Sequence, residues 1–365
     1  MHKEWVLVTS DGALLRDSLV AVRALAEAGY RPAVAVSCGF SLATFSRYCQ
    51  RRIDVPHPND PGYVPAIREE MTRLPYLAVL PASEVALLAL GVSVPALVDK
   101  SQVEERALAL GIPSPPGRVF SSAAELMAAA HELDYPVILK PAVHRYHASH
   151  VESAAALSAA ILKDGAVMVQ PYLREHLHAV SGVLWRGRLV AAVHERWFRI
   201  WRYHTGVATA AETITPDLQL EDKLTRLMEG YDGCFHAQFA GPYLLDLNLR
   251  VHTSHPLAVA AGANLVGIYC DLLRGVEVPT LRGRPGLFFR WIEGDIRHVA
   301  RALRMGAMTP RQALTALRPR RGTVHSTESL RDPKPMLSRL WYVGRKAASR
   351  AMGNSRISRG RADVD

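Results

Sequence analysis

Cysteine is scarce in this chain of 365 residues. The four cysteines, Cys38, Cys49, Cys234 and Cys270, are scattered and form no CxxC pair. Zinc sites built on cysteine need closely spaced pairs, and small secreted scaffolds need several disulfides. The sequence therefore excludes both classes, and we expect reduced thiols in a cytoplasmic protein.

Long apolar runs are missing as well. The apolar stretch at the amino-terminus is too short for the apolar core of a signal peptide. The most membrane-like stretch, residues 76–98, is interrupted by Pro81, Glu84 and Pro95. These interruptions predict strand, turn and helix rather than a membrane span, so we expect a soluble protein.

The glycine fingerprint GxGxxG of dinucleotide-binding domains is also absent, because TSDG follows the first predicted strand. What the first hundred residues do contain is an alternation of β-rich runs and amphipathic helical stretches. The β-rich runs are WVLVTS, PAVAVS, RRIDVP and YLAVLP, and the first helical stretch ends at Gly29. This alternation predicts a parallel, Rossmann-like sheet, and the missing fingerprint argues against a dehydrogenase.

Length and composition predict several globular domains, since 365 residues exceed one typical core and 49% of them are hydrophobic. The proline-rich segment GIPSPPG marks a join between two of them. We expect α/β and α+β domains in four parts: a Rossmann-like domain at 1–98, a small lobe at 99–172, a large lobe at 173–280, and a basic, partly helical extension at 281–365.

Two lysines lie where phosphate groups could be bound. Lys140 ends the predicted strand VILKP, and Lys100 follows Asp99 at the start of a predicted helix. Lysines near strand ends can neutralise the oxygens of a triphosphate. The alternative is a pair of ordinary surface lysines.

A strand that runs into a proline, MVQPYLREHLHAVSG, offers groups suited to a nucleoside. Its backbone could pair with an adenine, the Gln170 amide could reach the ring edge, and His178 could reach a ribose hydroxyl. A simple loop between domains is the alternative.

The predicted hairpin FHAQFAGPYLLDLNLR carries the most informative side chains. Alternation along the second strand places Asp246, Asn248 and Arg250 on one face, and Gln238 can point to that face from the first strand. Oxygen donors of these types suit Mg²⁺ held partly by substrate phosphates, and an arginine beside them suits an anion. The alternative is the solvated polar face of an antiparallel sheet.

The order DK, GIPSPP, VILKP, VQPYL and LLDLNLRVHTSHPLAVAAGANL resembles the ATP-grasp superfamily, in particular the branch of carbamoyl phosphate synthetase and the carboxylate-amine ligases. The resemblance covers roughly residues 1–275. It implies a Rossmann-like domain followed by two lobes that enclose ATP. It also implies an ATP-dependent ligase that activates a carboxylate as an acyl phosphate, with Mg²⁺ as cofactor and small carboxylate and amine substrates.

The resemblance carries roles to individual positions. It implies that Lys100 and Lys140 contact phosphates and that Arg250 stabilises the acyl phosphate, with Lys140 and Arg250 as the catalytic pair. The adenine would lie against Gln170, Tyr172 and Leu173, the last two through backbone, and the ribose against His178. The magnesium ligands would be Gln238, Asp246 and Asn248.

Two departures from the family pattern support a second hypothesis. The lid after Lys140 reads AVHRYHASH without glycine, and Asp246 stands where glutamate is usual. In a glycine-rich lid, backbone amides fold over the phosphates. In this chain the side chains of Arg145, His144 and His147 could take their place. The alternative function is an ATP-binding sensor or scaffold with little or no ligase turnover.

The acceptor pocket is expected near HERWFRIWRYHTG, where the resemblance favours Arg196 and Arg199 as carboxylate-binding residues. A sheet edge made soluble by arginine is the alternative. The histidines do not favour zinc: His144, His147 and His150 recur every third residue, which in an extended segment alternates sides, and His252 and His255 lie beside the magnesium face.

The last 85 residues are basic, with 19 Lys and Arg against 6 Asp and Glu. Within them, the stretch MLSRLWYVGRKAASRAM places Met336, Leu337, Leu340 and Trp341 near one side of a helix. This pattern allows peripheral contact with an anionic membrane at its inner surface, or a helix docked on the body with a loose basic end. A nucleic-acid partner is not expected, because no interleaved aromatic platform is present.

Overall fold

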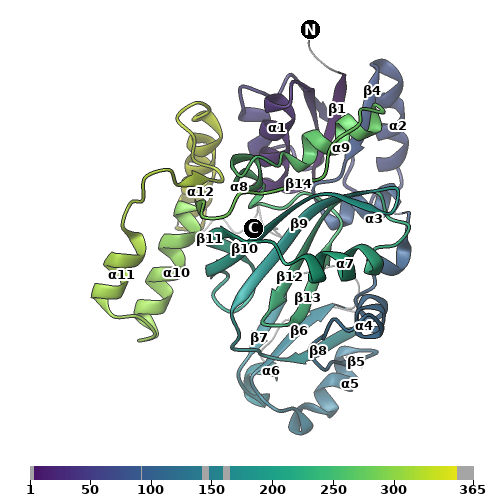
Figure 1. Ribbon diagram of the computed structural model, residues 1–365. Helices are drawn as coiled ribbons and strands as arrows, with labels where there is room; N and C mark the ends of the chain where they lie inside the picture. Colours follow the sequence, from purple (N-terminus) through teal and green to yellow (C-terminus); the bar gives the residue numbers. More distant parts are fainter. Residues whose placement is uncertain (1–3, 92, 142–147, 159–164, 352–365) are drawn as a thin grey trace.

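The computed structural model describes residues 4–91, 93–141, 148–158 and 165–351. Within them the chain forms three sheets (Figure 1). The amino-terminal sheet lies at one end of the molecule, the small sheet at the other, and the long strands of the large sheet lie between them. This is the mixed α/β and α+β architecture that the sequence predicts.

The amino-terminal sheet is parallel, in the order β3-β2-β1-β4. Its central strands are buried on both faces, as expected for a parallel sheet covered by helices. The first helix ends where Gly29 adopts a positive φ of 85°, which confirms the predicted stop. The elements are β1 (Trp5–Ser10), α1 (Arg16–Glu27), β2 (Arg31–Val36), η1 (Leu42–Phe45), β3 (Arg51–Asp54), α2 (Tyr63–Arg73), β4 (Tyr76–Leu80) and α3 (Glu84–Leu90).

The small sheet is antiparallel, in the order β5-β8-β6-β7. It is preceded by a short helical turn and by α4, whose start is set by the Asp99 carboxylate, which accepts from the backbone N–H groups of Ser101 and Gln102. The elements are η2 (Pro95–Leu97), α4 (Lys100–Ala109), β5 (Arg118–Phe120), α5 (Ala123–Ala128), η3 (Ala130–Glu132), β6 (Val137–Pro141), β7 (Ser149–Val151), α6 (Ala154–Ser158) and β8 (Val167–Pro171).

The large sheet follows the order β13-β12-β9-β10-β11-β15-β16, with β14 paired to β10. The hairpin predicted from the sequence is confirmed as β12 with β13, and β9 pairs with β10 around a second turn at Arg186 and Gly187. Its elements are β9 (Leu177–Trp185), β10 (Arg188–Trp201), β11 (Val207–Ile214), α7 (Leu218–Leu227), β12 (Gly233–Ala240), β13 (Tyr243–Asn248), α8 (His255–Ala260), α9 (Leu265–Leu273), β14 (Leu281–Arg282) and β15 (Phe288–Arg290).

The carboxy-terminal part adds α10 (Ile292–Arg304), α11 (Pro310–Leu317), β16 (Val324–His325) and α12 (Lys334–Ala351). It is held to the amino-terminal domain by Asp332, which is buried and accepts from Arg23 Nε at 2.9 Å, Ser46 Oγ at 2.7 Å and the Arg47 backbone N–H at 2.9 Å. On α12, Tyr342 stacks on Phe40 with ring centroids 4.7 Å apart. The first part of α12 is therefore a docked helix.

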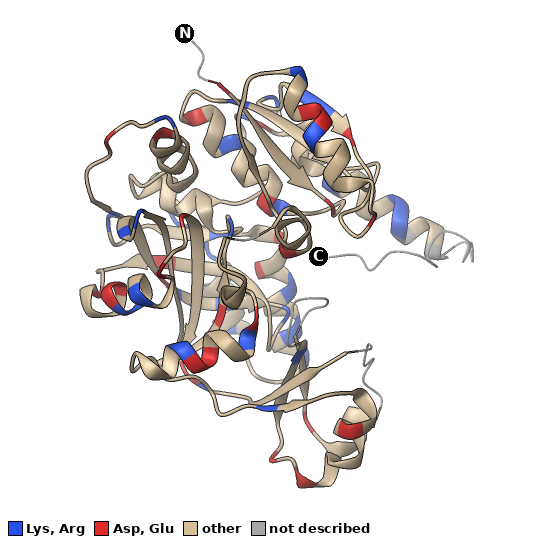
Figure 2. Cartoon of the chain, turned by 90° about the vertical axis from the view of Figure 1, so that its right-hand side faces the viewer, with Lys and Arg blue, Asp and Glu red and all other residues tan. Residues whose placement is uncertain are grey.

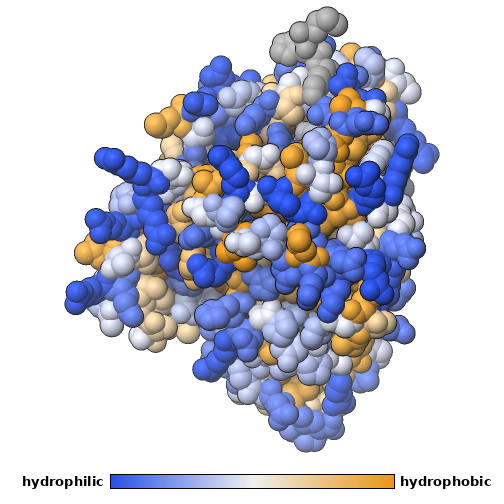
Figure 3. Space-filling view, in the orientation of Figure 1, coloured by the Kyte–Doolittle hydropathy of each residue, from blue (hydrophilic) through white to orange (hydrophobic). Residues whose placement is uncertain are grey.

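None of the described helices combines the length and the apolar character needed to cross a membrane. On the face shown in Figure 3, hydrophilic and hydrophobic residues are interspersed. Figure 2 shows basic and acidic residues interspersed mainly on helices and loops, whereas the strands are mostly uncharged.

Candidate active site

A cavity of about 520 Å³ is lined by all three parts of the fold. The small sheet contributes β6 and β8, the large sheet β12 and β13, and the amino-terminal domain the segment between β1 and α1. A space of this size is ordinary for a site that encloses a small ligand or nucleotide. Nine of the residues predicted from the sequence line it: Lys100, Lys140, Gln170, Tyr172, Leu173, Gln238, Asp246, Asn248 and Arg250.

The two lysines reach the cavity from different elements. Lys100 is the first residue of α4, and its ammonium group forms an ion pair with Asp246. Lys140 lies near the end of β6, and its Nζ donates to the Leu245 carbonyl oxygen at 2.8 Å. Both side chains thus converge on β13.

The pKa values of the lysines move in opposite directions. Burial lowers the pKa of Lys140 to about 8, and the charge of Lys100 adds to the effect. Burial also acts to lower the pKa of Lys100, but the carboxylates of Asp246 and Glu84 outweigh it, so this pKa is raised. An incoming polyanion would stabilise the protonated form of Lys140.

The β12–β13 hairpin brings the oxygen donors together. Gln238 lies directly opposite Asp246, and Asn248 lies opposite His236. Asn248 Nδ2 donates to Asp246 Oδ2 at 3.0 Å, so the two side chains lie on the same face, as the alternation predicts. A bulge between the turn and this pair shifts the register by one residue, and the resulting pairing places the Gln238 amide from β12 and the Asp246 carboxylate and Asn248 amide from β13 at the cavity.

Arg250 follows the end of β13. Its Nη1 donates to Asp17 Oδ1 at 2.7 Å, and its Nη2 lies 3.4 Å from Asn248 Oδ1. Asp17 is buried at the start of α1 and was not among the predicted residues. No local pattern in the sequence could connect it to Arg250.

The region predicted to hold adenine is in the cavity wall, but parts of it are already bonded. Gln170 Nε2 donates to the Pro115 carbonyl oxygen at 3.1 Å, and the Tyr172 backbone N–H donates to the Pro136 carbonyl oxygen at 3.0 Å. Gln170 is therefore oriented by the join between the domains, and the Tyr172 N–H is committed to the small sheet.

Three predicted residues do not line the cavity. His178 Nε2 donates to the Gly241 carbonyl oxygen at 2.7 Å and stacks on Phe239. Arg196 is exposed on β10 beside Phe198, and Arg199, on the same strand, is paired with the buried Asp295 of α10. The structure thus gives the ribose role of His178 and the substrate roles of the two arginines no support.

The lid residues His144, Arg145 and His147 lie outside the described residues. Among the remaining cavity residues, sequence reasoning missed the group from the β1–α1 segment, which includes Asp11 and Arg16, and the aromatic residues Trp197 and Trp201 of β10. The only signal for the first group is the polar TSDG after a buried strand, where ligands of open parallel sheets collect.

No protein-family profile matches this sequence, and no curated protein sequence does so either. Solved structures do match. An L-amino acid ligase from Bacillus licheniformis is 13% identical, with a TM-score of 0.54 over 75% of each chain. Carboxyaminoimidazole ribonucleotide synthase from Aspergillus clavatus, complexed with ATP, is 16% identical, with a TM-score of 0.61 over 84% of this chain and 87% of the other.

A third match is the biotin carboxylase domain of 2-oxoglutarate carboxylase from Hydrogenobacter thermophilus, in complex with MgADP, ADP and bicarbonate. It is 16% identical, with a TM-score of 0.57 over 79% of this chain and 74% of the other. The three enzymes share the ATP-grasp architecture. The order of sheets, the cavity between them and these matches lead to one conclusion: this chain has the ATP-grasp fold.

Proposed function

We propose that this chain is an ATP-dependent ligase that activates a substrate carboxylate as an acyl phosphate for attack by an amine. The observation that carries the proposal is the convergence of Lys100, Lys140 and Arg250 on a cavity that also presents Gln238, Asp246 and Asn248. Three cations facing a cluster of oxygen donors suit a triphosphate with its metal. The fold shared with ATP-dependent ligases supports the same chemistry.

In the proposed reaction, a carboxylate oxygen of the substrate attacks the γ-phosphorus of ATP, and the bond to the bridging oxygen of ADP breaks. The amine then attacks the acyl carbon, phosphate leaves with the former carboxylate oxygen, and the amine loses a proton. The charge that develops on the transferred group is spread over its oxygens, so catalysis depends on positioned cations. Lys140 and Arg250 would supply them.

The donor set fits Mg²⁺. Gln238, Asp246 and Asn248 offer one amide, one carboxylate and one further amide oxygen at the cavity, and hard divalent cations prefer such ligands. When bound, the ion neutralises phosphate charge and fixes the nucleotide against these residues. We propose ATP and Mg²⁺ as the cofactors.

A second candidate function, an ATP-binding sensor or scaffold with little turnover, is favoured by one observation. Lys100 and Asp246 form an ion pair with each other, so one predicted phosphate contact and one predicted metal ligand are engaged together. Ligase turnover requires that ATP and Mg²⁺ separate this pair. A protein that only senses nucleotide could keep it.

The test measures ADP release by the purified full-length chain in the presence of ATP and Mg²⁺. Amino acids and small dicarboxylates are supplied as the candidate acids. Ammonia and amino acids are supplied as the candidate amines. The ligase proposal expects ADP release that depends on both an acid and an amine. Equilibrium binding of ATP without ADP release for any pair would instead support the sensor function.

We propose, separately, that the protein is cytoplasmic and that α12 contacts the surface of an anionic membrane. Leu337, Leu340 and Trp341 are exposed on this docked helix, and Arg345 lies over the Trp341 ring. Exposed aliphatic and aromatic residues beside arginine are typical of helices that lie at an interface. Sedimentation with phosphatidylserine vesicles tests this proposal. The parent protein should sediment with the vesicles, and the triple variant Leu337→Ser, Leu340→Ser, Trp341→Ser should not. Equal sedimentation of the parent and the variant would contradict the proposal.

A further inference from the structure

Three buried side chains from different segments meet behind the cavity wall. Glu195 lies on β10, His236 on β12, and His252 on the segment after β13, and none of them is more than 5% exposed. One ligand atom from each lies within 4.8 Å of the others. Buried imidazole nitrogens and carboxylate oxygens are costly unless something binds them.

A serine hydroxyl contacts the Nδ1 atom of each of the two histidines. Ser181 Oγ lies 2.7 Å from His236 Nδ1, and Ser254 Oγ lies 3.3 Å from His252 Nδ1. The rings stack with centroids 3.7 Å apart. Within the described part of the chain, the Nε2 atoms of both rings are buried and have no hydrogen-bond partner. Each ring thus has one nitrogen anchored and the other unused.

The carboxylate is anchored as well. Glu195 Oε1 accepts from Trp197 Nε1 at 3.0 Å and from Ser254 Oγ at 2.9 Å. Ser254 therefore contacts both the carboxylate and His252. Outer hydrogen bonds of this kind orient metal-binding side chains and are part of most metal sites.

The ligand types identify the class of ion. Two imidazoles and one carboxylate suit Zn²⁺ and related transition metals, whereas Mg²⁺ prefers oxygen ligands alone. Two atoms that are each about 2.1 Å from one ion are at most about 4.2 Å apart. To bind one ion, the ligand atoms must approach by a fraction of an ångström and the two stacked rings must tilt toward each other, because each nitrogen lone pair lies in its ring plane.

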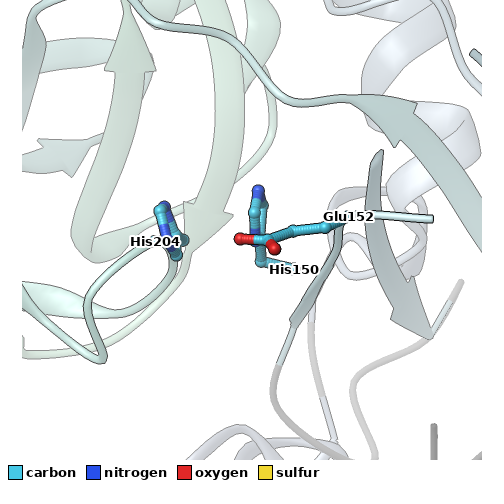
Figure 4. Close-up of side chains that lie close together, drawn as sticks. All are labelled: His150, Glu152 and His204. Carbon is cyan, nitrogen blue, oxygen red and sulfur yellow. The ribbon is translucent and has the colours of Figure 1, made fainter. Parts of the chain in front are cut away.

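A second group of histidines provides a comparison. His150, Glu152 and His204 also lie within 4.8 Å of one another, and in Figure 4 the two rings lie side by side with the Glu152 carboxylate beside them. The Glu152 side chain is 69% exposed, however, and His204 Nδ1 lies 3.3 Å from the Tyr172 hydroxyl. The Nε2 atoms of His150 and His204 are buried without a hydrogen-bond partner in the described part of the chain, but the Glu152 carboxylate is open to water and can be hydrated without a metal.

We propose that Glu195, His236 and His252 bind a divalent transition-metal ion, with Zn²⁺ as the best match. The ion reaches the site from the cavity, which is lined by His252 and Trp197. Two guanidinium groups, those of Arg250 and Arg16, act on His252, and the charge of Arg250 is partly offset by its ion pair with Asp17. The site goes beyond the proposed ligase function and does not depend on it.

The experiment uses the full-length chain, stripped with a chelator and titrated with Co²⁺ without nucleotide, with visible absorption as the readout. We expect one Co²⁺ per chain with an absorption band of tetrahedral or five-coordinate cobalt, displaced by Zn²⁺. His236→Phe, which keeps an aromatic ring in the stack, and the isosteric Glu195→Gln should each weaken binding at least tenfold.

Two matched controls separate this site from its neighbours. His204→Ala removes a ligand of the surface cluster, and Asn248→Ala removes a predicted Mg²⁺ ligand; both should keep full Co²⁺ binding. Absence of Co²⁺ binding by the parent protein overturns the proposal, and so does binding that is lost in His204→Ala but kept in Glu195→Gln. ADP release plays no part, so failure here is independent of the ligase function.

Discussion

Arg250 Nη1 donates a hydrogen bond to Asp17 Oδ1 at 2.7 Å, although 233 residues separate the two in the chain. The contact joins the end of the predicted metal-binding strand to the first helix of the amino-terminal domain. It holds the guanidinium at the cavity, where Arg250 also approaches Asn248. The amino-terminal domain therefore contributes to the orientation of the arginine that we propose as a catalytic cation.

Asp17→Asn should impair turnover more than stability. Burial raises the pKa of Asp17 despite the opposing charge of Arg250, so the folded protein gains little from the ionised form, and a neutral amide of the same shape avoids that cost. The amide oxygen can still accept from Arg250, but a neutral hydrogen bond contributes about 0.5–1.5 kcal/mol against about 1.5–3 kcal/mol for one to a charged group, so the weakened anchor should lower kcat several-fold. Kinetics and thermal unfolding test this, and an unchanged kcat would contradict it.

Lys140→Met should weaken ATP binding by roughly tenfold or more, because a buried cation that faces phosphate is removed. Lys223→Met is the matched control, since Lys223 Nζ also donates to a backbone carbonyl, that of Gly111, at 2.7 Å, but lies outside the cavity. Isothermal titration with ATP and Mg²⁺ measures both. Equal affinities of the two variants would exclude Lys140 as a phosphate contact.

ATP affinity should fall as the pH rises from about 7 to 9. The pKa of Lys140 is lowered to about 8 by burial and by Lys100, so the free protein loses this charge over that range, and a triphosphate binds the charged form better. Lys140→Arg should flatten the profile, because arginine stays protonated. A profile that is flat in the parent protein would show that Lys140 does not face the nucleotide.

Asn248→Ala should reduce ATP affinity in Mg²⁺ and lower turnover, since it removes an oxygen donor from the hairpin face. ATP affinity measured with EDTA in place of Mg²⁺ should change much less, because the effect acts through the ion. Asn59→Ala, on an exposed loop, serves as the control. Wild-type affinity and turnover in Asn248→Ala would refute the metal role.

Asp332→Ala should lower the free energy of unfolding by about 3–5 kcal/mol, because it leaves the partly buried Arg23 without its carboxylate partner. Protease should then release the carboxy-terminal segment more readily. Asp54→Ala, which breaks the exposed ion pair with Arg52, should change stability by less than about 1 kcal/mol. Urea unfolding compares the two, and similar losses would contradict the docking role of Asp332.

Much of the fold was predictable because its signals are local. Local signals of this kind, between residues close together in the sequence, mark the strands of the amino-terminal sheet, the β12–β13 hairpin and the helix start at Asp99. The pairing of Gln238 with Asp246 is different, because a bulge between the turn and this pair shifts the register by one residue. Side-chain period and turn chemistry act over a few residues, so a single sequence displays them.

The sequence by itself determined the parallel first sheet, the hairpin with its row of oxygen donors, and the two lysines placed at element ends. Only the tertiary structure decided that Arg250 forms an ion pair with Asp17 and that Arg199 forms one with Asp295. It also brought Glu195, His236 and His252 together in one buried cluster. These contacts join segments that are far apart in the chain. They form because the packing of separate sheets brings the segments together. The periodicity of residue types along the chain does not predict which distant side chains will then be in contact.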